Sequence, residues 1–565
     1  MKSWGVIAAA VLVIALPFIF RKPPPIGAWE EGDPVLIAIS PHNEAIRHEF
    51  AHGFSEWRQA QGKSPVKIDW RVVGGTSEIS RYLNSEMQAS FKAWWIRQGN
   101  EWPQGASEFV TSRRFSPEGK DPAVVEVREA LRSVDDPDQF GTGLDLFFGG
   151  GVYDHDRSGK EGLTVEPWPE GIPKSVTHSS SGKLVIPEGL SGEEWRSPLF
   201  VGTAVSTFGI VANLDRLNDL GVEKRPEVWA DLADPVYFKE LGVSDPTKSG
   251  SIAKAFEMLI HQQIYNSVME AGFTVEDISL FEEDVELAPE AYNDAIRVGW
   301  INGLNLVRLI GANARYFTDS ASKVPIDVSM ANAAVGLAID FYGRYQAESS
   351  RNPDGSERMI YETPVGGSSV SADPISLLRG APHRELAVEF IEYVLSEDGQ
   401  KIWNYKVGTP GGPEKYALRR LPIRRDFYPS DDPEFQAKFE EHQPYYSDPL
   451  GDPSVNPYYL ASQFEYIPRW TGRHFGINRY LIRAMCLDAG EELSAAWAAI
   501  QAAGGPEAVP EAMEALLAMP PDLNWDSALG EDYHSSRQMV FMREWVIFFR
   551  QQYRLAKELA EADHA

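Results

Sequence analysis

The order of short apolar and amphipathic segments near the start of this chain sets its fold class. Residues 35–39 are wholly apolar, which is typical of a strand buried on both faces of a sheet. Residues 43–61 place apolar side chains at i, i+4 and i+8 from Ile46, which predicts a helix. Residues 66–73 read as a second strand. A strand, a helix and a strand in this order predict an α/β fold with a right-handed parallel crossover.

The same kind of alternation continues along much of the chain. Strands are predicted at 144–148 and 208–212, a helix from Ile252, a strand and helix over 335–342, and a helix at 385–395. From about Pro429 onward the strand patterns stop and the sequence becomes helical. The stretch 87–140 is rich in Trp and charge, so we interpret it as a helical insertion in the α/β core.

Composition excludes several classes of protein. The 565 residues are 43% hydrophobic with a mean hydropathy of −0.30, which excludes a disordered chain and a polytopic membrane protein. A net charge of −29 argues against nucleic acid as a partner, because phosphate backbones require clustered Lys and Arg. The single cysteine, Cys486, excludes an intrachain disulfide and a C-x-x-C metal site.

The N-terminus predicts export. Lys2 precedes an apolar run over residues 6–20, which ends at Arg21-Lys22 and three prolines. This pattern is typical of a signal sequence, because the run is short of the ~20 residues that span a bilayer. No clear A-x-A cleavage site follows, so an uncleaved anchor over residues 4–20 in the inner membrane stays open. Both alternatives predict a periplasmic protein.

A Ser-Gly-Ser sequence at the start of a predicted helix is a candidate anion site. Ser249, Gly250 and Ser251 precede the apolar helix from Ile252, so they would offer hydroxyls, free N–H groups and the positive end of the helix dipole. The alternative is an ordinary N-cap, in which Ser249 satisfies its own helix.

Two further candidates lie at predicted strand ends. His42 follows the first strand, at the edge where open α/β sheets bind ligands, so it could contact a metal or an anion. Its alternative is a cap or surface residue. Asp340 and Tyr342 end the strand-like run from 335, and Tyr342 could donate a hydrogen bond or bind a metal. The alternative for that tyrosine is packing.

Glycine-rich loops follow several predicted strands. They are Gly74-Gly75-Thr76-Ser77, Gly149-Gly150-Gly151 and Gly366-Gly367-Ser368-Ser369. Several such loops at strand ends predict a cleft lined with backbone donors, in which Thr76, Ser77 and Gly150 are candidate ligand contacts.

Several signatures of common enzymes are missing from the sequence. It contains no G-x-x-x-x-G-K-[ST], no G-x-S-x-G, and no G-x-G-x-x-G after the first strand. His48 and His52 lie four positions apart on one predicted helix, but no third metal ligand is near them in the sequence, so we interpret this pair as surface residues. Cys486 has an apolar context, which is unlike that of a thiol nucleophile. We therefore expect a protein that is not an enzyme.

Several segments, in order, resemble the periplasmic solute-binding proteins of ABC importers, in the ferric-iron and phosphonate-type branch. The most specific are PEVWADL at 226–232, Asp234-Pro235 and DPTKSGS at 245–251; DLFFGG at 145–150 and ADPI at 372–375 are also similar. The resemblance implies two α/β lobes joined by crossing hinge strands, which close on a ligand.

The resemblance also implies a domain plan. Lobe 1 would span 33–205, with the insertion at about 87–140, and return at 361–430; lobe 2 would span 206–360. A signal or anchor and linker at 1–32 and a helical C-terminal extension at 431–565 complete the plan.

For the ligand, the resemblance implies an anion at Ser249–Ser251, with Asn313 as a second contact. In iron binders the matching metal ligands would be His42, a carboxylate at Glu86 and two adjacent tyrosines, of which only Tyr342 is present. Because Fe³⁺ prefers anionic oxygen, the missing phenolate weakens the case for iron. We expect a small anionic solute such as a phosphonate or an organophosphate, with ferric iron or another metal complex as the alternative transported ligand.

The resemblance implies an ABC permease as the partner, a monomeric protein and no resident cofactor. One alternative is a membrane-anchored ligand-sensing ectodomain, which an uncleaved N-terminus would favour. Another is an enzyme on the same fold, which would turn its ligand over instead of releasing it intact.

Overall fold

The computed structural model describes residues 29–113, 115–530, 533 and 537–562. The predicted signal or anchor segment over residues 4–20 lies outside the described residues. Within the described ranges, every helix is too short or too polar to cross a membrane.

The larger of two main sheets has eight strands. Its central order is β15-β8-β14-β3-β1-β2, with β4 paired to β14 and β7 to β8. The bounds are β1 (Val35–Ile39), β2 (Lys67–Arg71), β3 (Leu146–Phe148), β4 (Thr164–Val165), β7 (Arg196–Ser197), β8 (Phe200–Ser206), β14 (Ser371–Leu378) and β15 (Leu421–Pro422). Strand β1 is parallel to β2 and β3, as the sequence predicts, whereas β14 is antiparallel to β3 and β8.

The second sheet has five strands in the order β11-β10-β12-β9-β13. The bounds are β9 (Phe208–Asn213), β10 (Leu241–Ser244), β11 (Ala314–Thr318), β12 (Val335–Ile339) and β13 (Met359–Glu362). All residues of β9, β10 and β12 are buried, because helices cover both faces of this sheet. A separate two-stranded sheet pairs β5 (Gly189–Leu190) with β6 (Glu193–Glu194).

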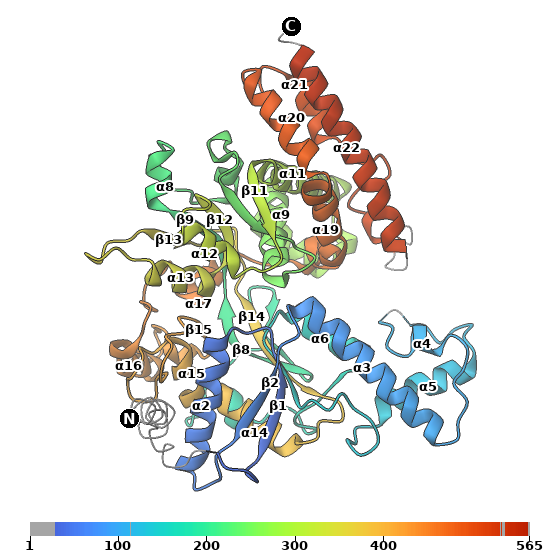
Figure 1. Ribbon diagram of the computed structural model, residues 1–565, viewed down its shortest axis with the longest axis vertical. Helices are drawn as coiled ribbons and strands as arrows, with labels where there is room; N and C mark the ends of the chain where they lie inside the picture. The colour runs from blue at the N-terminus through green and yellow to red at the C-terminus, as the bar shows by residue number, and fades with distance from the viewer. Residues whose placement is uncertain (1–28, 114, 531–532, 534–536, 563–565) are drawn as a thin grey trace, which may run out of the picture.

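The chain crosses between the two main sheets at their adjoining edges. Strand β8 ends at Ser206 in the first sheet and β9 begins at Phe208 in the second; β13 ends at Glu362 and β14 begins at Ser371 back in the first. Figure 1 shows the two sheets stacked one above the other, with β8 and β14 running toward the junction. This is the two-lobed α/β arrangement with crossing strands that the sequence resemblance implies. We call the part built on the eight-stranded sheet lobe 1 and the other lobe 2.

The division of the chain into lobes and an extension is our proposal. We propose lobe 1 at 33–205 and 361–430, lobe 2 at 206–360 and an extension at 431–565. The chain crosses between the sheets close to these limits, between Ser206 and Phe208 and between Glu362 and Ser371.

Helices on lobe 1 bury an aromatic cluster against its sheet. They are α2 (Glu44–Ala60), α14 (Arg384–Leu395) and α15 (Glu397–Asn404). Asn43 caps α2 by accepting a hydrogen bond from the N–H of Ile46. Phe50 of α2 lies 4.3 Å from Trp403 of α15 and 5.6 Å from Phe148 of β3, measured between ring centroids. This packing fixes the loop that carries His42 at the sheet edge.

The Trp-rich stretch is helical and has its own small core. Helix α3 (Thr76–Arg97) begins before the predicted limit at 87, and α4 (Ala106–Phe109) and α5 (Pro122–Ser133) follow. Phe91 and Leu131 are buried in a cluster separate from the main core. Because α3 starts at Thr76, its N-terminus belongs to the glycine loop at the top of lobe 1.

Lobe 2 packs two long helices very closely. They are α9 (Gly250–Glu270) and α11 (Glu290–Asn313), and glycines on α11 permit the contact. A Cβ atom on Gly303 would lie 2.7 Å from the Cα of Ile260. Helix α13 (Asp340–Ser349) corrects one prediction: Asp340 begins a helix that includes Tyr342, instead of ending a strand. The remaining helices are α8 (Leu214–Asp219), α10 (Val275–Glu283) and α12 (Lys323–Ser329).

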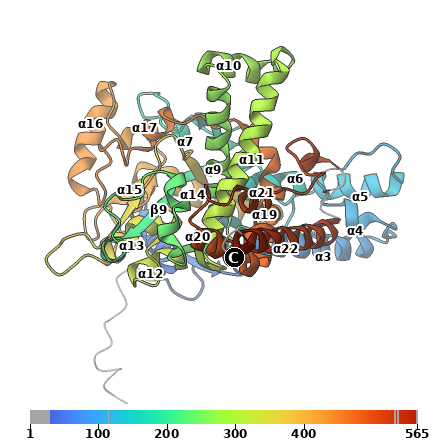
Figure 2. The same ribbon diagram turned by 90° about the horizontal axis from the view of Figure 1, so that it is seen from above.

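The C-terminal extension is helical, as predicted, and most of it packs on lobe 2. Its helices are α16 (Pro433–His442), α17 (Pro457–Ser462), α18 (Pro468–Thr471), α19 (Phe475–Ile482), α20 (Gly490–Ala502), α21 (Pro510–Leu517) and α22 (Gln538–Ala562), with a π-helical turn at Arg483–Asp488. Helices α19 and α20 contact α11, and α22 covers α20 and α21 through buried Trp545, Phe549 and Tyr553. Figure 2 shows α19, α20, α21 and α22 together on one side of the molecule.

Candidate ligand-binding cleft

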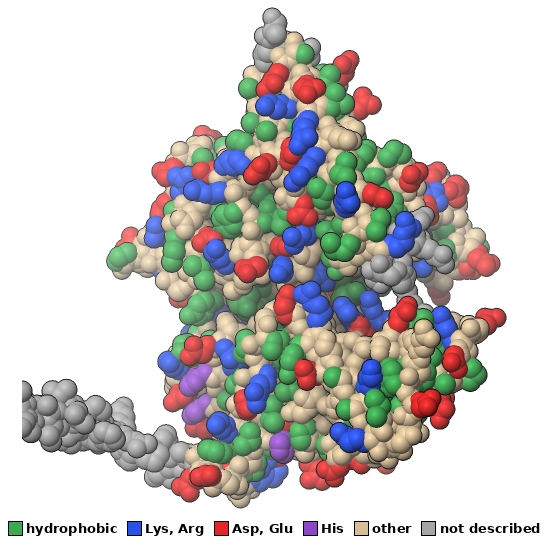
Figure 3. Space-filling model, turned by 45° about the vertical axis from the view of Figure 1, so that its right-hand side comes forward, with side chains coloured by type: hydrophobic (Ala, Val, Ile, Leu, Met, Phe, Trp, Pro, Cys, Tyr) green, Lys and Arg blue, Asp and Glu red, His purple; other side chains and the backbone are tan. Residues whose placement is uncertain are grey.

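A cavity of about 850 Å³ lies between the lobes. Lobe 1 contributes Thr76 and Asp154, lobe 2 contributes Gly250, and the extension contributes Tyr466 and Phe475 to its wall. Figure 3 shows a groove between the upper and lower halves of the molecule, with Lys and Arg side chains gathered along it.

The two lobes approach each other closely at one side of this cavity. A Cβ atom on Gly75 of lobe 1 would lie 2.9 Å from the carbonyl oxygen of Lys248 in lobe 2. A Cβ atom on Gly250 would lie 3.0 Å from Thr76 Oγ1 across the same junction. The glycines therefore permit a closed arrangement in which backbone from each lobe faces the other.

Three helices begin at the cavity, two from lobe 1 and one from lobe 2. They are α3 at Thr76, α6 (Val152–Glu161) and α9 at Gly250. The first N–H groups of a helix have no partner within it, and they form the positive end of its dipole. Helix starts from both lobes thus direct partial positive charge at one space.

Ser249 serves its own helix and the cavity together. Its Oγ accepts a hydrogen bond from the N–H of Ile252 at 3.3 Å, so the N-cap interpretation describes this contact. Ser249 also lines the cavity beside Gly250 and Ser251. Capping leaves the hydroxyl hydrogen of Ser249 and the N–H groups of Gly250 and Ser251 to face a ligand.

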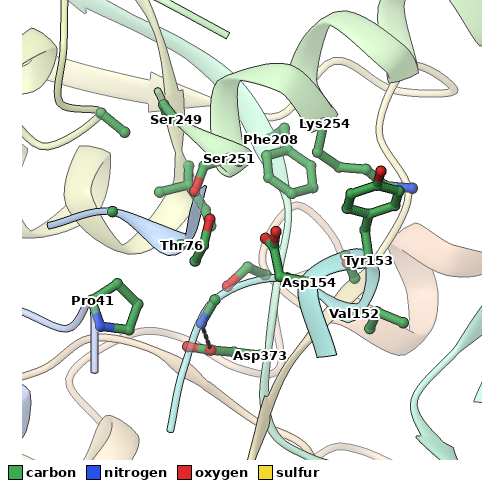
Figure 4. Close-up of a pocket in the computed structure, with 18 of the residues that line it drawn as sticks. Pro41, Thr76, Val152, Tyr153, Asp154, Phe208, Ser249, Ser251, Lys254 and Asp373 are labelled. Carbon is green, nitrogen blue, oxygen red and sulfur yellow. Dashed lines mark hydrogen bonds between the residues drawn. The ribbon is translucent and has the colours of Figure 1, made fainter. Parts of the chain in front are cut away.

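Thr76 places a buried hydroxyl at the same point. Thr76 is only 8% exposed, and its Oγ1 makes no hydrogen bond with the described residues. Figure 4 shows Thr76, Ser251 and Asp154 directed at one region of the cavity. A buried hydroxyl without a partner is costly, so a ligand atom there would satisfy it.

A buried cluster of charges forms the floor of the cavity. Asp373 Oδ2 lies 2.9 Å from His42 Nε2 and pairs with Arg420 Nη1, while Asp373 Oδ1 accepts the N–H of Gly150 at 2.8 Å. Arg420 Nη2 donates to Ser206 Oγ at 3.0 Å. Since Asp373 is on β14 and Ser206 ends β8, this cluster joins both crossing strands.

The titration of the cluster follows from its burial and charges. Burial lowers the pKa of His42, although Asp373 opposes this shift. Burial alone would raise the pKa of Asp373, but Arg420 and His42 together hold it well below its usual range. Asp373 is therefore ionised at neutral pH, and its charge is matched by that of Arg420.

A second charge cluster lies where both lobes and the extension meet. Lys254 Nζ of α9 lies 2.8 Å from Glu193 Oε1 and 3.0 Å from Glu257 Oε2. The hydroxyl of Tyr466 donates to Glu257 Oε1 at 2.6 Å, and its ring lies under the Lys254 ammonium. Lys254 is thus the shared cationic partner of two buried carboxylates.

The extension also bridges the lobes directly. Arg479 Nη2 of α19 donates to Ser77 Oγ of lobe 1 at 2.6 Å, and Nε donates to the carbonyl of Pro246 in lobe 2 at 2.7 Å. The ring of Phe475 lies 4.7 Å from that of Tyr153 on α6. Part of the extension therefore belongs to the binding cleft.

The structure brings most of the predicted contacts to one cavity. Those that line it are His42, Thr76, Gly150, Ser249, Gly250, Ser251 and Tyr342. Ser77 lies just outside the lining, where its hydroxyl accepts the hydrogen bond from Arg479.

Two predicted contacts lie elsewhere. The amide of Asn313 donates to the carbonyls of Leu232 at 3.0 Å and Asp234 at 2.8 Å and accepts the indole N–H of Trp497 at 2.9 Å, so its bonding capacity is used. Asp340 is buried behind the cavity wall, where it accepts the N–H of Phe341, and burial raises its pKa to about 6. Asn313 and Asp340 therefore lie outside the cavity lining in this structure.

The predicted iron ligands are not brought together. Glu86 is exposed on α3, away from the cavity lined by His42 and Tyr342. Burial raises the pKa of Tyr342 to about 12, which disfavours the phenolate that Fe³⁺ prefers. Among the described residues, no group of three His, Cys, Asp or Glu side chains is arranged to hold a metal ion. These residues do not fit the iron site that the resemblance implies.

Sequence reasoning missed five residues of the site: Asp154, Lys254, Asp373, Arg420 and Tyr466. Asp154 closely follows the run Gly149-Gly150-Gly151, and Asp373 lies within the ADPI segment, so a local signal existed for both. Arg420 and Tyr466 carry no local signal, because they reach the cavity only through tertiary packing.

Comparison with known proteins gives one family match. Residues 180–431 match the family described as bacterial extracellular solute-binding protein. An uncharacterized protein of Haemophilus influenzae is 23% identical over 206 residues, which are 36% of this chain and 46% of that protein. The chain thus spans about half the length of that curated relative.

Three solved structures are similar at low identity. The periplasmic binding protein P5PA has 15% identity, a TM-score of 0.42 and coverage of 69% of this chain and 86% of its own. AfuA of Actinobacillus pleuropneumoniae, with fructose-6-phosphate bound, has 14% identity and a TM-score of 0.41, and the match covers 73% of this chain and 97% of AfuA. Iron-bound HitA of Pseudomonas aeruginosa has 14% identity and a TM-score of 0.38, and the match covers 73% of this chain and 99% of HitA.

The family match includes both crossing strands and the whole five-stranded sheet. It also includes the start of α9, where Ser249 and Gly250 face the cavity. The similarity to bacterial extracellular solute-binding proteins thus extends over residues 180–431, which hold these parts of the cleft.

Proposed function

We propose that this protein captures a small oxyanion solute, of the phosphonate or organophosphate type, and delivers it to an ABC permease in the inner membrane. The observation that carries the proposal is the meeting of three helix N-termini, from both lobes, at one cavity that also holds the buried hydroxyl of Thr76. Helix starts bind oxyanions because free N–H groups and the dipole act together.

The proposed binding step couples the ligand to closure of the lobes. An oxyanion would accept hydrogen bonds from Gly250 and Ser251 of lobe 2 and from the Thr76 hydroxyl of lobe 1. Since both sets of donors reach one ligand only when the lobes are closed, binding favours the closed state. Opening at the permease would release the solute unchanged.

Three buried carboxylates of the cavity are paired with cations. Carboxylates of Glu193, Glu257 and Asp373 are matched by Lys254 and Arg420, so most of the buried negative charge is compensated. The net charge of −29 repels an anion at long range, but screening at physiological salt confines that effect to about 8 Å. Local donors therefore decide the affinity.

The remaining parts of the proposal concern location and assembly. We propose that residues 1–32 direct export to the periplasm, either as a cleaved signal or with residues 4–20 retained as an anchor, and that the protein acts as a monomer. Iron is the weaker proposal for the ligand, because Glu86 and Tyr342 do not offer the donors that Fe³⁺ prefers.

Removing two hydroxyls from the α9 start should weaken oxyanion binding. We expect Ser249→Ala with Ser251→Ala to lower the affinity for methylphosphonate about 10- to 100-fold, on the scale of one or two hydrogen bonds to a charged group. Isothermal titration calorimetry measures the dissociation constant. The same change should cost about 1 kcal/mol of stability through the lost cap, which a thermal melt checks separately.

Ser267→Ala provides the matched control, because Ser267 is near the far end of the same helix and outside the cavity. Its affinity should equal that of the natural protein. Unchanged affinity in the double variant would show that the helix start is not the oxyanion site.

A further inference from the structure

One carboxylate in the cavity has no cationic partner. Asp154 lies in the first turn of α6, is 3% exposed and lines the cavity. Among the described residues, no Lys, Arg or His nitrogen lies within 4.0 Å of its carboxylate. The other deeply buried acids of the lining, Glu193, Glu257 and Asp373, all have such a partner.

The position of Asp154 is at the proposed oxyanion site. Its Oδ2 would lie 3.5 Å from a Cβ atom on Gly250 of the opposite lobe, and 3.9 Å from one on Gly151 before its own helix. Figure 4 shows its carboxylate directed up into the cavity, toward Ser251 and Phe208. The side chain therefore faces the ligand space more closely than it faces the start of α6.

A buried carboxylate without a partner is costly. Desolvation raises the pKa of Asp154, while Arg479 and the Thr76 hydroxyl oppose this shift, and none of the neighbouring arginines that the structure describes forms an ion pair with it. An acid near a helix start gains some stabilisation from the dipole. That gain accounts for an Asp in the first turn, but it does not supply a partner for a carboxylate turned toward the opposite lobe.

A plain oxyanion beside this carboxylate would be repelled, because like charges in a buried site cannot both be stabilised easily. A solute with an ammonium group removes the conflict, since its cation pairs with Asp154 while its oxyanion meets the N–H groups of α9. The cavity of about 850 Å³ also has room for a solute larger than a bare oxyanion.

We propose that Asp154 binds an ammonium group of the solute, so that the transported ligand is a zwitterion that carries both an oxyanion and an amine. This inference rests on the proposed function and narrows it to a substrate class, the aminoalkyl phosphonates and phosphates. Asp154 is then the residue that determines specificity.

The test compares two probes that differ by one aminomethyl group. We expect the natural protein to bind 2-aminoethylphosphonate at least about 10-fold more tightly than methylphosphonate, because only the former pairs with Asp154. Asp154→Asn should weaken binding of 2-aminoethylphosphonate about 10- to 100-fold and leave methylphosphonate binding equal or tighter. Isothermal titration calorimetry measures all four dissociation constants.

The opposite changes for the two probes separate specificity from damage to the fold. A variant that had lost structure would bind both probes less tightly, which would overturn the assignment of Asp154. The preference of the natural protein needs no variant, so equal affinities for the two probes would also overturn it. Asp138→Asn, on the exposed surface of lobe 1, should leave both affinities unchanged.

Two further outcomes separate failure of the amine assignment from failure of the proposed function. Tighter binding of glycerol 3-phosphate than of 2-aminoethylphosphonate would overturn the amine assignment in favour of a hydroxyl group. Binding of none of these probes by the natural protein would contradict the proposed function itself, and the inference on Asp154 would fall with it.

Discussion

Replacing Arg420 by methionine is expected to lower the free energy of unfolding by about 3–5 kcal/mol. Arg420 is 1% exposed and neutralises Asp373, which would otherwise remain as a buried charge. The guanidinium also donates to Ser206 at 3.0 Å and lies 4.1 Å from the ring centroid of Phe341. The change therefore removes one contact to each crossing strand.

Urea denaturation followed by tryptophan fluorescence measures this loss at pH 7. Arg425→Met is the matched control, because Arg425 lies five positions away, is exposed and forms no ion pair with the described residues; its effect should stay within about 0.5 kcal/mol. Adding Asp373→Asn to Arg420→Met should recover part of the loss, since the buried charge is then removed. A loss below about 1 kcal/mol would contradict the account of the cluster.

The pH dependence of this effect has a defined sign. Because the folded pKa of Asp373 is depressed, its stabilising contribution is complete above its unfolded pKa, about 3.9, and is lost as pH falls toward the folded value. The stability difference between the natural protein and Arg420→Met should therefore shrink below about pH 4. A difference that is constant with pH would contradict an electrostatic origin.

Replacing Lys254 by methionine should cost a similar amount, about 3–5 kcal/mol, at neutral pH. The change leaves the carboxylates of Glu193 and Glu257 without their cation, and both side chains are almost fully buried. The loss should diminish toward pH 5, because unpaired buried carboxylates take up protons more readily.

Denaturation curves at pH 5 and pH 7 test this prediction. Lys323→Met is the control, because Lys323 is exposed at the start of α12 and has no ion pair within the described part of the chain. An effect that is equal at both pH values, or that is below about 1 kcal/mol at pH 7, would show that Lys254 does not neutralise the pair.

Local patterns predicted the parts of the fold that depend on neighbouring residues. The apolar run at 35–39 gave β1 with its observed bounds, and the helix predicted from Ile252 is α9, which starts two residues earlier at Gly250. Strand β8 at Phe200–Ser206 was missed, because Gly202 and Thr203 interrupt its apolar run although every residue is buried. It is covered by β14, β15 and α15, which are distant in the sequence, so no local pattern reveals its burial.

The residues of the candidate site also differ in whether a local sequence pattern could reveal them. Ser249 and His42 were predictable because a helix start and a strand end are local features. Asp373 and His42 are 331 positions apart, so their pairing exists only in the folded chain. The placement of Asn313 outside the cavity lining was not predictable, because Trp497 of the extension donates to its amide oxygen and the resemblance carries no information about that added segment.

The most direct test of the proposed function is native mass spectrometry with metal analysis on protein purified without chelators. The account predicts one small anionic solute per chain, carried between the lobes and released intact on denaturation, without stoichiometric iron. Stoichiometric iron in the purified protein, in place of an organic oxyanion, would contradict it.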